Sequence, residues 1–253
     1  MTTISTEPSA NPALPVAGTH NFRSTAGYPA AGGVIRDGAL FRSDALHRLG
    51  QDGRESFAAH GIVRIIDLRD ATELASSPSD VDGLGAEVIH HPVFTDAAVP
   101  GAGAPISLEA VYRIIVERHA DRLAQALLLI ADAPDGGVLV HCTAGKDRTG
   151  MVIAAALLTV GVPREQVLAD YATSGPNLAG EWAETMLAAV ERHYPGPLAP
   201  ELRELILASP AGTLAATLDL VDREHGGITA LLAAHGLDQA AVERLRTRLV
   251  TTV

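Results

Sequence analysis

The hydrophobic pattern is marked most clearly by two short, almost continuous apolar segments. Residues 62–68, IVRIIDL, and 138–140, VLV, are rich in aliphatic and β-branched side chains, which favours strands. Because apolar and polar residues hardly alternate along them, we expect a sheet that is covered on both faces. Residues 86–93 predict a further strand, and apolar residues at 34–35 and 39–41 predict a short hairpin.

Helical periodicity dominates the rest of the chain. Ser107 is a suitable N-cap for a long helix over 107–131, in which apolar side chains recur every three or four residues. An apolar helix starts near Arg148 and runs to residue 160. Further helices are expected at 51–60, 71–76, 164–173, 180–194, 200–208, 213–225, 228–235 and 238–250. Residues 174–177 are expected to break the helical pattern.

The composition fits one folded domain with a short extension. The chain has 253 residues, of which 47% are hydrophobic, so it can bury a large core. Aromatic residues make up 4%, and the core must therefore consist mostly of Ala, Leu, Val and Ile. Residues 1–17 are rich in Ser, Thr, Pro and Ala and are expected to be mobile. We expect 18–253 to form a single domain, because it contains no internal repeat and no linker.

Charge and targeting signals narrow the partners and the compartment. The formal net charge is −11, so nucleic acid is not expected as a partner. No apolar run reaches about 18 residues, so stable membrane insertion is not expected either. The N-terminus lacks a basic segment followed by an apolar one, and no signal peptide is predicted. We expect a cytoplasmic protein, with export by a signal-free route as the alternative. The single cysteine excludes an internal disulfide.

One loop carries the candidate chemistry. Residues 141–149, HCTAGKDRT, lie between the strand at 138–140 and the apolar helix. Ala144 and Gly145 have little or no side chain, so backbone N–H groups can turn toward an anion. The start of the helix adds unpaired N–H groups and the positive end of its dipole. These features favour a bound oxyanion and the thiolate form of Cys142.

The side chains around this cysteine suggest how a phosphoryl group would be held. The planar guanidinium of Arg148 can bind two phosphoryl oxygens at once. Thr149 can donate its hydroxyl to the thiolate or position a water, and the ring of His141 can hydrogen-bond the loop backbone. Lys146 adds a positive charge at the rim that could extend the site to phosphoinositides, or is a solvated lysine. The predicted phosphate-binding set is Thr143, Ala144, Gly145, Lys146, Asp147, Arg148 and Thr149.

The loop resembles a known phosphatase signature. HCTAGKDRTG is similar to the HCxxGxxR[ST] loop of cysteine-based tyrosine and dual-specificity phosphatases, and most similar to that of bacterial, lipid-phosphatase-like tyrosine phosphatases. NFR at 21–23 and FRS at 41–43 resemble further segments of that family, although Ser24 stands where members often have Asp. The likeness extends from about residue 20 to the end. It implies an α/β fold: a central, mostly parallel sheet with helices on both faces and a helical C-terminal part.

The resemblance also implies an activity. Phosphomonoesters would be hydrolysed through a cysteinyl-phosphate on Cys142, without a metal or a cofactor. Phosphotyrosine is the favoured substrate, and dual-specificity or phosphoinositide substrates lie within the family's range. A phosphatase for a small phosphorylated metabolite is the main alternative, and a non-catalytic phosphate-binding module is a further one. A P-loop NTPase is excluded because Val140 stands where its first glycine is required.

The general acid has several candidates. Many tyrosine phosphatases take it from a WPD loop, but the single tryptophan, Trp182, is followed by Ala and Glu and lies after the cysteine. Asp147 is favoured, because family members of this type use an Asp there and a nearby phosphate dianion favours its protonated form. Asp96 comes next, since it lies in a loop before the helix at 107–131. Asp132 and Asp135 are the remaining candidates.

Three further features each have two interpretations. Arg23 and Arg42 could line the phosphate pocket, but surface or structural ion pairs are favoured. Asp67 and Arg69 end a strand at the edge where α/β sheets bind ligands, or they form an ion pair that fixes the next helix. Residues 177–210 hold a helical pair where a mycobacterial family member has a cover over its active site. They form either a lid or an ordinary helical extension.

Overall fold

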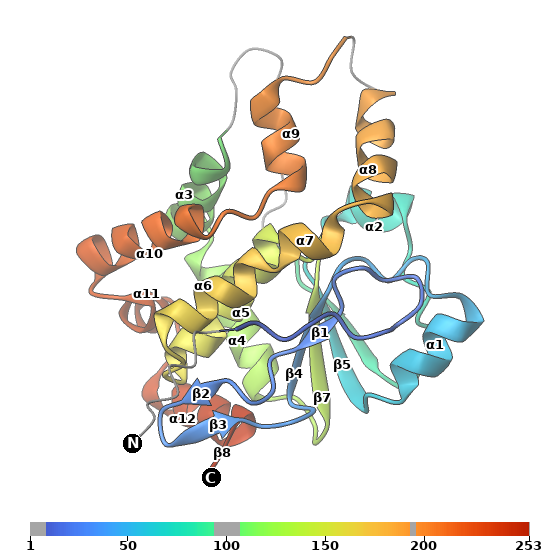
Figure 1. Ribbon diagram of the computed structural model, residues 1–253. Helices are drawn as coiled ribbons and strands as arrows, with labels where there is room; N and C mark the ends of the chain where they lie inside the picture. Colours follow the sequence, from blue (N-terminus) through green and yellow to red (C-terminus); the bar gives the residue numbers. More distant parts are fainter. Residues whose placement is uncertain (1–8, 94–106, 193–195, 253) are drawn as a thin grey trace, which may run out of the picture.

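A five-stranded sheet lies at the centre of the computed structural model, which describes residues 9–93, 107–192 and 196–252 (Figure 1). Its strand order is β1 (Arg23–Ser24), β4 (Leu40–Ser43), β7 (Gly137–His141), β5 (Ile62–Asp67) and β6 (Glu87–His90). The last four strands are parallel, and β1 is antiparallel to β4. The expected mostly parallel sheet is confirmed, although β6 is shorter than the strand predicted at 86–93.

Helices surround the sheet and make up nearly all of the described chain after β7. They are α1 (Gly50–Ala58), α2 (Ala71–Ser76), α3 (Leu108–Arg118), α4 (Ala120–Ala131), α5 (Asp147–Thr159), α6 (Arg164–Ala172), α7 (Ser174–Leu178), α8 (Glu181–Glu191), α9 (Pro200–Leu207), α10 (Ala211–His225), α11 (Ile228–Ala234) and α12 (Gln239–Leu249). Most of them match the predicted helices, with ends shifted by a few residues.

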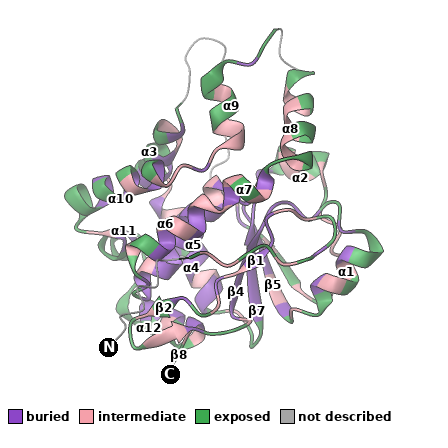
Figure 2. Ribbon diagram, viewed as in Figure 1, coloured by how far each residue is buried: buried purple, intermediate pink, exposed green. Residues whose placement is uncertain are grey.

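Side chains of the central strands alternate between two apolar layers. Ile66 and Val140 belong to the larger core, together with buried residues of α3, α4, α5, α10, α11 and α12. Ile65 and Leu139 belong to a smaller core on the other face, which includes Phe57 of α1. Both faces of the sheet are therefore covered, which explains why its strands hardly alternate between apolar and polar residues. Figure 2 shows the central strands and α5 as mostly buried.

One predicted helix is two helices in the structure. Ser107 caps α3 as expected, and its hydroxyl accepts a hydrogen bond from the Ala110 N–H at 3.2 Å. The prediction of a single helix over 107–131 is wrong, because the backbone leaves the helical conformation at His119, where φ is −131°. The two helices have different partners: α3 packs against α10, whereas α4 packs against α5, α11 and α12. Tertiary packing therefore sets the break.

The predicted hairpin is also wrong. β3 (Gly33–Ile35) pairs with β2 (Pro29–Ala30) and with β8 (Val250–Thr251) in a second, three-stranded sheet, while β4 belongs to the main sheet. Gly33 makes this close pairing feasible, since a Cβ there would lie 2.0 Å from the Thr251 carbonyl oxygen. One of the two partners of β3 is thus a strand near residue 250, which no local pattern reveals.

The helical pair predicted within 177–210 stands out from the body of the molecule (Figure 1). Residues 174–177 do not break the helical pattern as expected, because they form most of α7, which leads into α8. Neither α8 nor α9 has a fully buried residue, and Figure 2 shows both as half-buried or exposed. The pair is lightly attached, as a cover that opens needs to be. Its motion stays a prediction.

Part of the N-terminal segment is fixed on the domain. The Leu14 N–H donates to the Phe22 carbonyl at 2.8 Å, and Val16 is buried. The Asn11 side chain donates to the carbonyl oxygens of Ser24 and Ala26, each at 2.9 Å. These contacts differ from the expectation of a mobile segment over 1–17, because residues 11–16 have specific partners. Residues 1–8 lie outside the described residues.

No helix in the described parts of the chain is by itself long and apolar enough to cross a membrane. α9 and α10 meet the length and composition of a span when they are counted together, but they are bent by 84° at the break between them.

Candidate active site

The loop at 141–148 connects the carboxyl end of β7 with the first turn of α5. Cys142 lies in it with 2% of its surface exposed. Gly145 has a φ of +66°, and a Cβ there would lie 2.2 Å from the Ser43 carbonyl oxygen at the end of β4. Glycine is required here, both for the conformation and for the close approach to a neighbouring strand. The loop is therefore bent against the sheet and leads directly into the N-terminus of α5.

His141 precedes Cys142, Thr149 follows Arg148, and both are fully buried. His141 Nδ1 lies 3.2 Å from the Cys142 carbonyl oxygen, and its Nε2 lies 3.6 Å from the Asp67 carboxylate. Burial lowers the pKa of His141, although the charge of Asp67 opposes this effect. The Thr149 hydroxyl has no hydrogen-bond partner among the described residues, so it is available to a bound group.

Arg148 is held by a carboxylate from another element. Its guanidinium donates to both oxygens of Glu73, at 2.5 and 2.7 Å, and the Thr143 hydroxyl donates to the same carboxylate at 2.5 Å. Burial opposes ionisation of Glu73, but the hydrogen bonds and charge of Arg148, with the Thr143 bond, lower its pKa to about 2. Burial alone would lower the pKa of Arg148, and Glu73 outweighs this and raises it. The pair is fully ionised at neutral pH.

Glu73 was not among the site residues predicted from the sequence; it belongs to the capping box of α2. Asp70 accepts the N–H groups of Thr72 and Glu73 at 2.8 Å, and the Glu73 carboxylate accepts the Asp70 N–H at 2.9 Å. The Asp-x-x-Glu spacing is a signal for such a box. It does not reveal that the same carboxylate also reaches Arg148, which lies 75 residues further along the chain.

Asp147, the favoured general acid, is tied to a pair of tyrosines. The Tyr112 hydroxyl of α3 donates to Asp147 Oδ1 at 2.9 Å and lies 2.6 Å from the Tyr171 hydroxyl of α6. Burial and the charge of Asp147 raise the pKa of Tyr112 well above its usual value, so its proton stays in place as a donor. The Asp147 side chain keeps 23% of its surface exposed, so a substrate can reach it.

The other acid candidates do not meet at this site within the described chain. Asp132 is exposed and bonds to Arg244 at 2.8 Å, and Asp135 is exposed just before β7. Both aspartates precede β7, whereas Cys142 follows it. The extended strand therefore places roughly 20 Å between Asp135 and the cysteine. Neither is placed to protonate the oxygen that would leave when Cys142 attacks phosphorus. Asp96 lies outside the described residues.

Lys146 points away from the predicted rim. Its side chain is 1% exposed, and the ammonium donates at 2.7 Å to the carbonyl oxygens of Leu205 and Ala208 at the end of α9. A cation at a helix C-terminus satisfies carbonyls that have no partner in the helix and interacts favourably with the dipole. The predictions of a rim charge and of a solvated lysine are both wrong in this structure. Lys146 links the phosphate loop to the helical pair.

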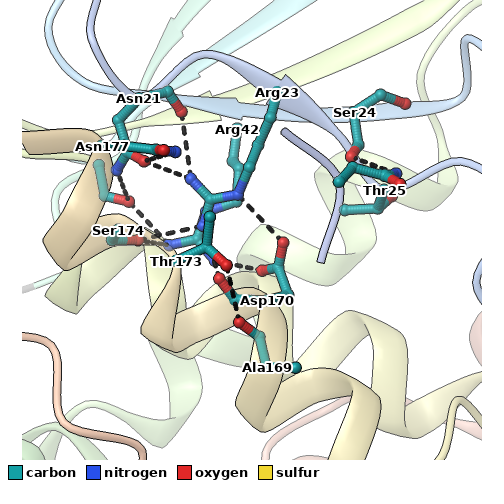
Figure 3. A network of polar contacts seen from close by, with 12 residues as sticks. Asn21, Arg23, Ser24, Thr25, Arg42, Ala169, Asp170, Thr173, Ser174 and Asn177 are labelled. Atoms are coloured by element: carbon teal, nitrogen blue, oxygen red, sulfur yellow. Dashed lines mark hydrogen bonds and ion pairs between the residues drawn. The ribbon is translucent and has the colours of Figure 1, made fainter. Parts of the chain in front are cut away.

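The two arginines of the N-terminal strands form structural ion pairs, one of the two kinds of ion pair, surface or structural, that were favoured from the sequence (Figure 3). Arg23 Nε lies 3.1 Å from Asp170 Oδ1, and Arg42 Nη1 lies 2.5 Å from Asp170 Oδ2. All three side chains are buried. Burial and the charge of Arg42 lower the pKa of Arg23 to about 10, against the opposing effect of Asp170. Arg23 therefore remains charged at neutral pH.

Asp67 and Arg69 also form a buried ion pair, with Arg69 Nη2 2.6 Å from Asp67 Oδ2. Arg69 Nη1 donates to the Ser77 carbonyl at 2.7 Å, which fixes the end of α2. Of the two interpretations of these residues, the ion pair is confirmed. By holding α2 in place, it helps to keep Glu73 against Arg148.

A cavity of about 220 Å³ adjoins the loop on the side of Thr143 and Glu73. Side chains of α8, Trp182 and Met186 among them, line it together with His20. The helical pair predicted within 177–210 therefore reaches the loop at two points, through this cavity and through Lys146. Within the described residues, no group of three or more His, Cys, Asp or Glu side chains is arranged to hold a metal ion.

A buried cysteine follows a parallel strand, a glycine bends the loop after it, and an arginine lies in the first turn of the next helix; these are the features expected of a cysteine-based phosphatase loop. The chain belongs to the tyrosine phosphatase family, whose model matches residues 14–251. It is 30% identical to the triple specificity protein phosphatase PtpB of Mycobacterium tuberculosis, over 90% of this chain and 96% of that protein. It is also 30% identical to a tyrosine-protein phosphatase of Nostoc commune, over 83% of this chain and 74% of that protein.

Proposed function

We propose that this protein hydrolyses phosphomonoesters by cysteine-dependent catalysis, with phosphotyrosine in proteins as its main substrate. The observation that carries the proposal is the placement of Cys142 and Arg148 on one loop at the N-terminus of α5. That position favours a bound oxyanion and a thiolate together. A relative named for triple specificity makes a broader range of phosphomonoesters the second expectation.

The reaction takes two steps. The Cys142 thiolate attacks phosphorus, so that an S–P bond forms while the bond from phosphorus to the leaving oxygen breaks. Arg148 and the loop N–H groups bind the non-bridging oxygens as their charge redistributes. Water then attacks the cysteinyl-phosphate, the S–P bond breaks and inorganic phosphate leaves. Glu73 keeps Arg148 oriented through both steps.

Asp147 supplies and then recovers the proton. In its acid form it protonates the leaving oxygen, and in the second step its carboxylate takes a proton from the attacking water. The hydrogen bond from Tyr112 to Oδ1 supports this role, because it fixes the carboxyl group, and Oδ2, which lies 3.6 Å from the Lys146 ammonium, then carries the transferred proton. Thr149 directly follows Arg148, and its buried hydroxyl, which has no hydrogen-bond partner among the described residues, is available to donate a hydrogen bond to the thiolate.

A comparison of kcat/KM across substrates tests the proposal. The panel contains phosphotyrosine, phosphoserine and phosphothreonine peptides, phosphoinositides, nucleotides and sugar phosphates. We expect the highest value for a phosphotyrosine peptide, full activity in EDTA, and no turnover by Cys142→Ser, because a neutral hydroxyl is a far poorer nucleophile. A sugar phosphate or nucleotide at the top of the panel would instead identify a metabolite phosphatase. Full activity of Cys142→Ser would refute the mechanism.

A further inference from the structure

Two carbonyl oxygens of the phosphate loop accept hydrogen bonds from buried side chains of distant elements. Asn21 Nδ2 donates to the carbonyls of Ala144 and Gly145 at 3.0 and 3.2 Å. Arg42 Nη2 donates to the Gly145 carbonyl at 2.7 Å. Asn21 and Arg42 are both 0% exposed, so water does not compete for these bonds. Neither side chain takes part in the reaction steps described above.

Peptide geometry connects these bonds to phosphate binding. In a planar trans peptide the C=O and the following N–H point in opposite directions. Holding the carbonyls of Ala144 and Gly145 therefore fixes the N–H groups of Gly145 and Lys146 toward the opposite side. Successive N–H groups that point the same way form a concave binding site for an anion. We infer that Asn21 and Arg42 are positioning residues that turn these two N–H groups toward the phosphoryl group.

The two positioning side chains are themselves held in one orientation (Figure 3). The Asn21 amide oxygen accepts bonds from Arg23 Nη1 and, at 3.1 Å, from Asn177 Nδ2, so its NH₂ group must face the loop. The backbone N–H of Asn21 donates to Asp44 at 2.9 Å. Arg42 uses Nη1 for Asp170 and Nη2 for the loop, so its two contacts come from two nitrogens of a planar fork, whereas a lysine would have to make both from one nitrogen.

The test uses Arg42→Lys and Asn21→Ser, made in parallel because a buried arginine variant can fail to fold. Arg42→Lys keeps the charge but replaces the two-nitrogen fork that spans Asp170 and the Gly145 carbonyl with a single nitrogen, and Asn21→Ser removes the two amide donors. Two readouts are measured in folded protein: the inhibition constant of inorganic phosphate, and the pH dependence of Cys142 alkylation by iodoacetamide. Alkylation reports on one thiol, because the chain has one cysteine. We expect the inhibition constant to rise at least about tenfold, as for loss of an oriented donor to a charged group, and the thiol to titrate at higher pH.

Thr25→Val is the matched control for lost stability. The buried Thr25 hydroxyl bonds to the Leu40 carbonyl at 3.1 Å and makes no bond to the loop, so its loss should lower the melting temperature but leave both readouts unchanged. If Arg42→Lys and Asn21→Ser lose stability but retain wild-type values of both readouts, the two residues belong to the scaffold and the inference is overturned. The inference rests on the proposed function. If that function were wrong, phosphate would not slow the alkylation of wild-type Cys142, and this result is distinct from unchanged readouts in the two variants.

Discussion

At the scale of single residues, the arginine that would bind phosphate is oriented before any substrate arrives. Glu73 accepts two hydrogen bonds from the Arg148 guanidinium and a third from Thr143, and it completes the capping box of its own helix. A bidentate contact restricts the guanidinium to one plane. Binding of a phosphoryl group therefore does not have to order this side chain, which reduces the entropic cost of reaching the transition state.

Replacing Glu73 with Gln should lower kcat/KM about 10- to 100-fold for every phosphomonoester, since a hydrogen bond to a charged group contributes about 1.5–3 kcal/mol. The variant should also lose stability in a pH-dependent way. Folding lowers the pKa of Glu73 from 4.5 to about 2, so the carboxylate stabilises the fold above pH 4.5 and this contribution fades as the pH falls toward 2. Urea unfolding should show a larger difference from wild type at about pH 6 than at about pH 3. Equal differences would contradict the assignment.

Asp147→Asn tests the general acid. The amide cannot donate a carboxylic proton. Alkyl phosphates release an alkoxide, which is a poor leaving group, so their turnover should fall by about 10²- to 10⁴-fold. Turnover of a nitrophenyl phosphate should fall much less, because its leaving group needs little protonation. Asp132→Asn is the control, since Asp132 is exposed and bonds to Arg244. An equal loss on both substrates would assign Asp147 a structural role.

At the scale of elements, one lysine joins the phosphate loop to a helix that is otherwise lightly attached. α9 has no fully buried residue, yet its terminal carbonyls are capped by Lys146 from the loop. α8 approaches the same loop from the other side, through the cavity that Trp182 lines. This pair of contacts is the physical basis for treating α8 and α9 as a lid over Cys142, which has no second cysteine to protect it from overoxidation.

Lys146→Met should loosen this lid. The change leaves the last carbonyls of α9 without their cation, so the helical pair should open more often and hydrogen peroxide should inactivate Cys142 several-fold faster. Arg203→Met is the matched control, because Arg203 lies on α9 but pairs with the exposed Glu191 at 3.5 Å. Inactivation rates are measured for wild type and both variants. Unchanged protection in Lys146→Met would mean that α8 and α9 are ordinary scaffold.

At the scale of the whole molecule, a buried ionic cluster fastens the N-terminal strands to the helical half. Arg23 of β1 and Arg42 of β4 share one carboxylate, Asp170 of α6, which lies 147 and 128 residues further along the chain. Burial opposes ionisation of Asp170, but the two arginines hold its pKa below the usual value. The cluster connects β1 and β4, which pair with each other, to α6, which belongs to no sheet.

Asp170→Asn should destabilise the whole domain. It leaves two buried arginines without a counter-charge, a change that typically costs about 3–5 kcal/mol. Asp219→Asn is the control: it removes an exposed carboxylate paired with Arg164 at 2.5 Å and should cost less than about 1 kcal/mol. Urea unfolding of both variants measures the difference. Similar costs for the two would show that the buried cluster contributes no more than a surface pair.

The sequence by itself determined the features that depend on neighbouring residues. The apolar run at 138–140, the small residues after Cys142 and the amphipathic helices each follow from local pattern, and the structure has them. The choice of Cys142 and Arg148 belongs to this group, because the loop that joins them is short. Ion pairs of Arg23 and Arg42 were also favoured from the sequence, but whether they lie on the surface or in the interior was left open, and the fold placed them in the interior.

Tertiary structure decided which residues meet across the chain. Glu73 reaches Arg148 over 75 residues and Lys146 reaches α9 over 59, and neither spacing has a periodic signal. The break at His119 and the pairing of β3 with β8 have the same origin, because each depends on which surface the folded chain offers nearby. The hydrophobic pattern of a segment indicates which of its faces is apolar and can be buried. A buried polar side chain instead bonds to a partner that the completed fold places within hydrogen-bond distance. Leaving such a group without a hydrogen bond costs more free energy than the conformational preference of a single residue contributes.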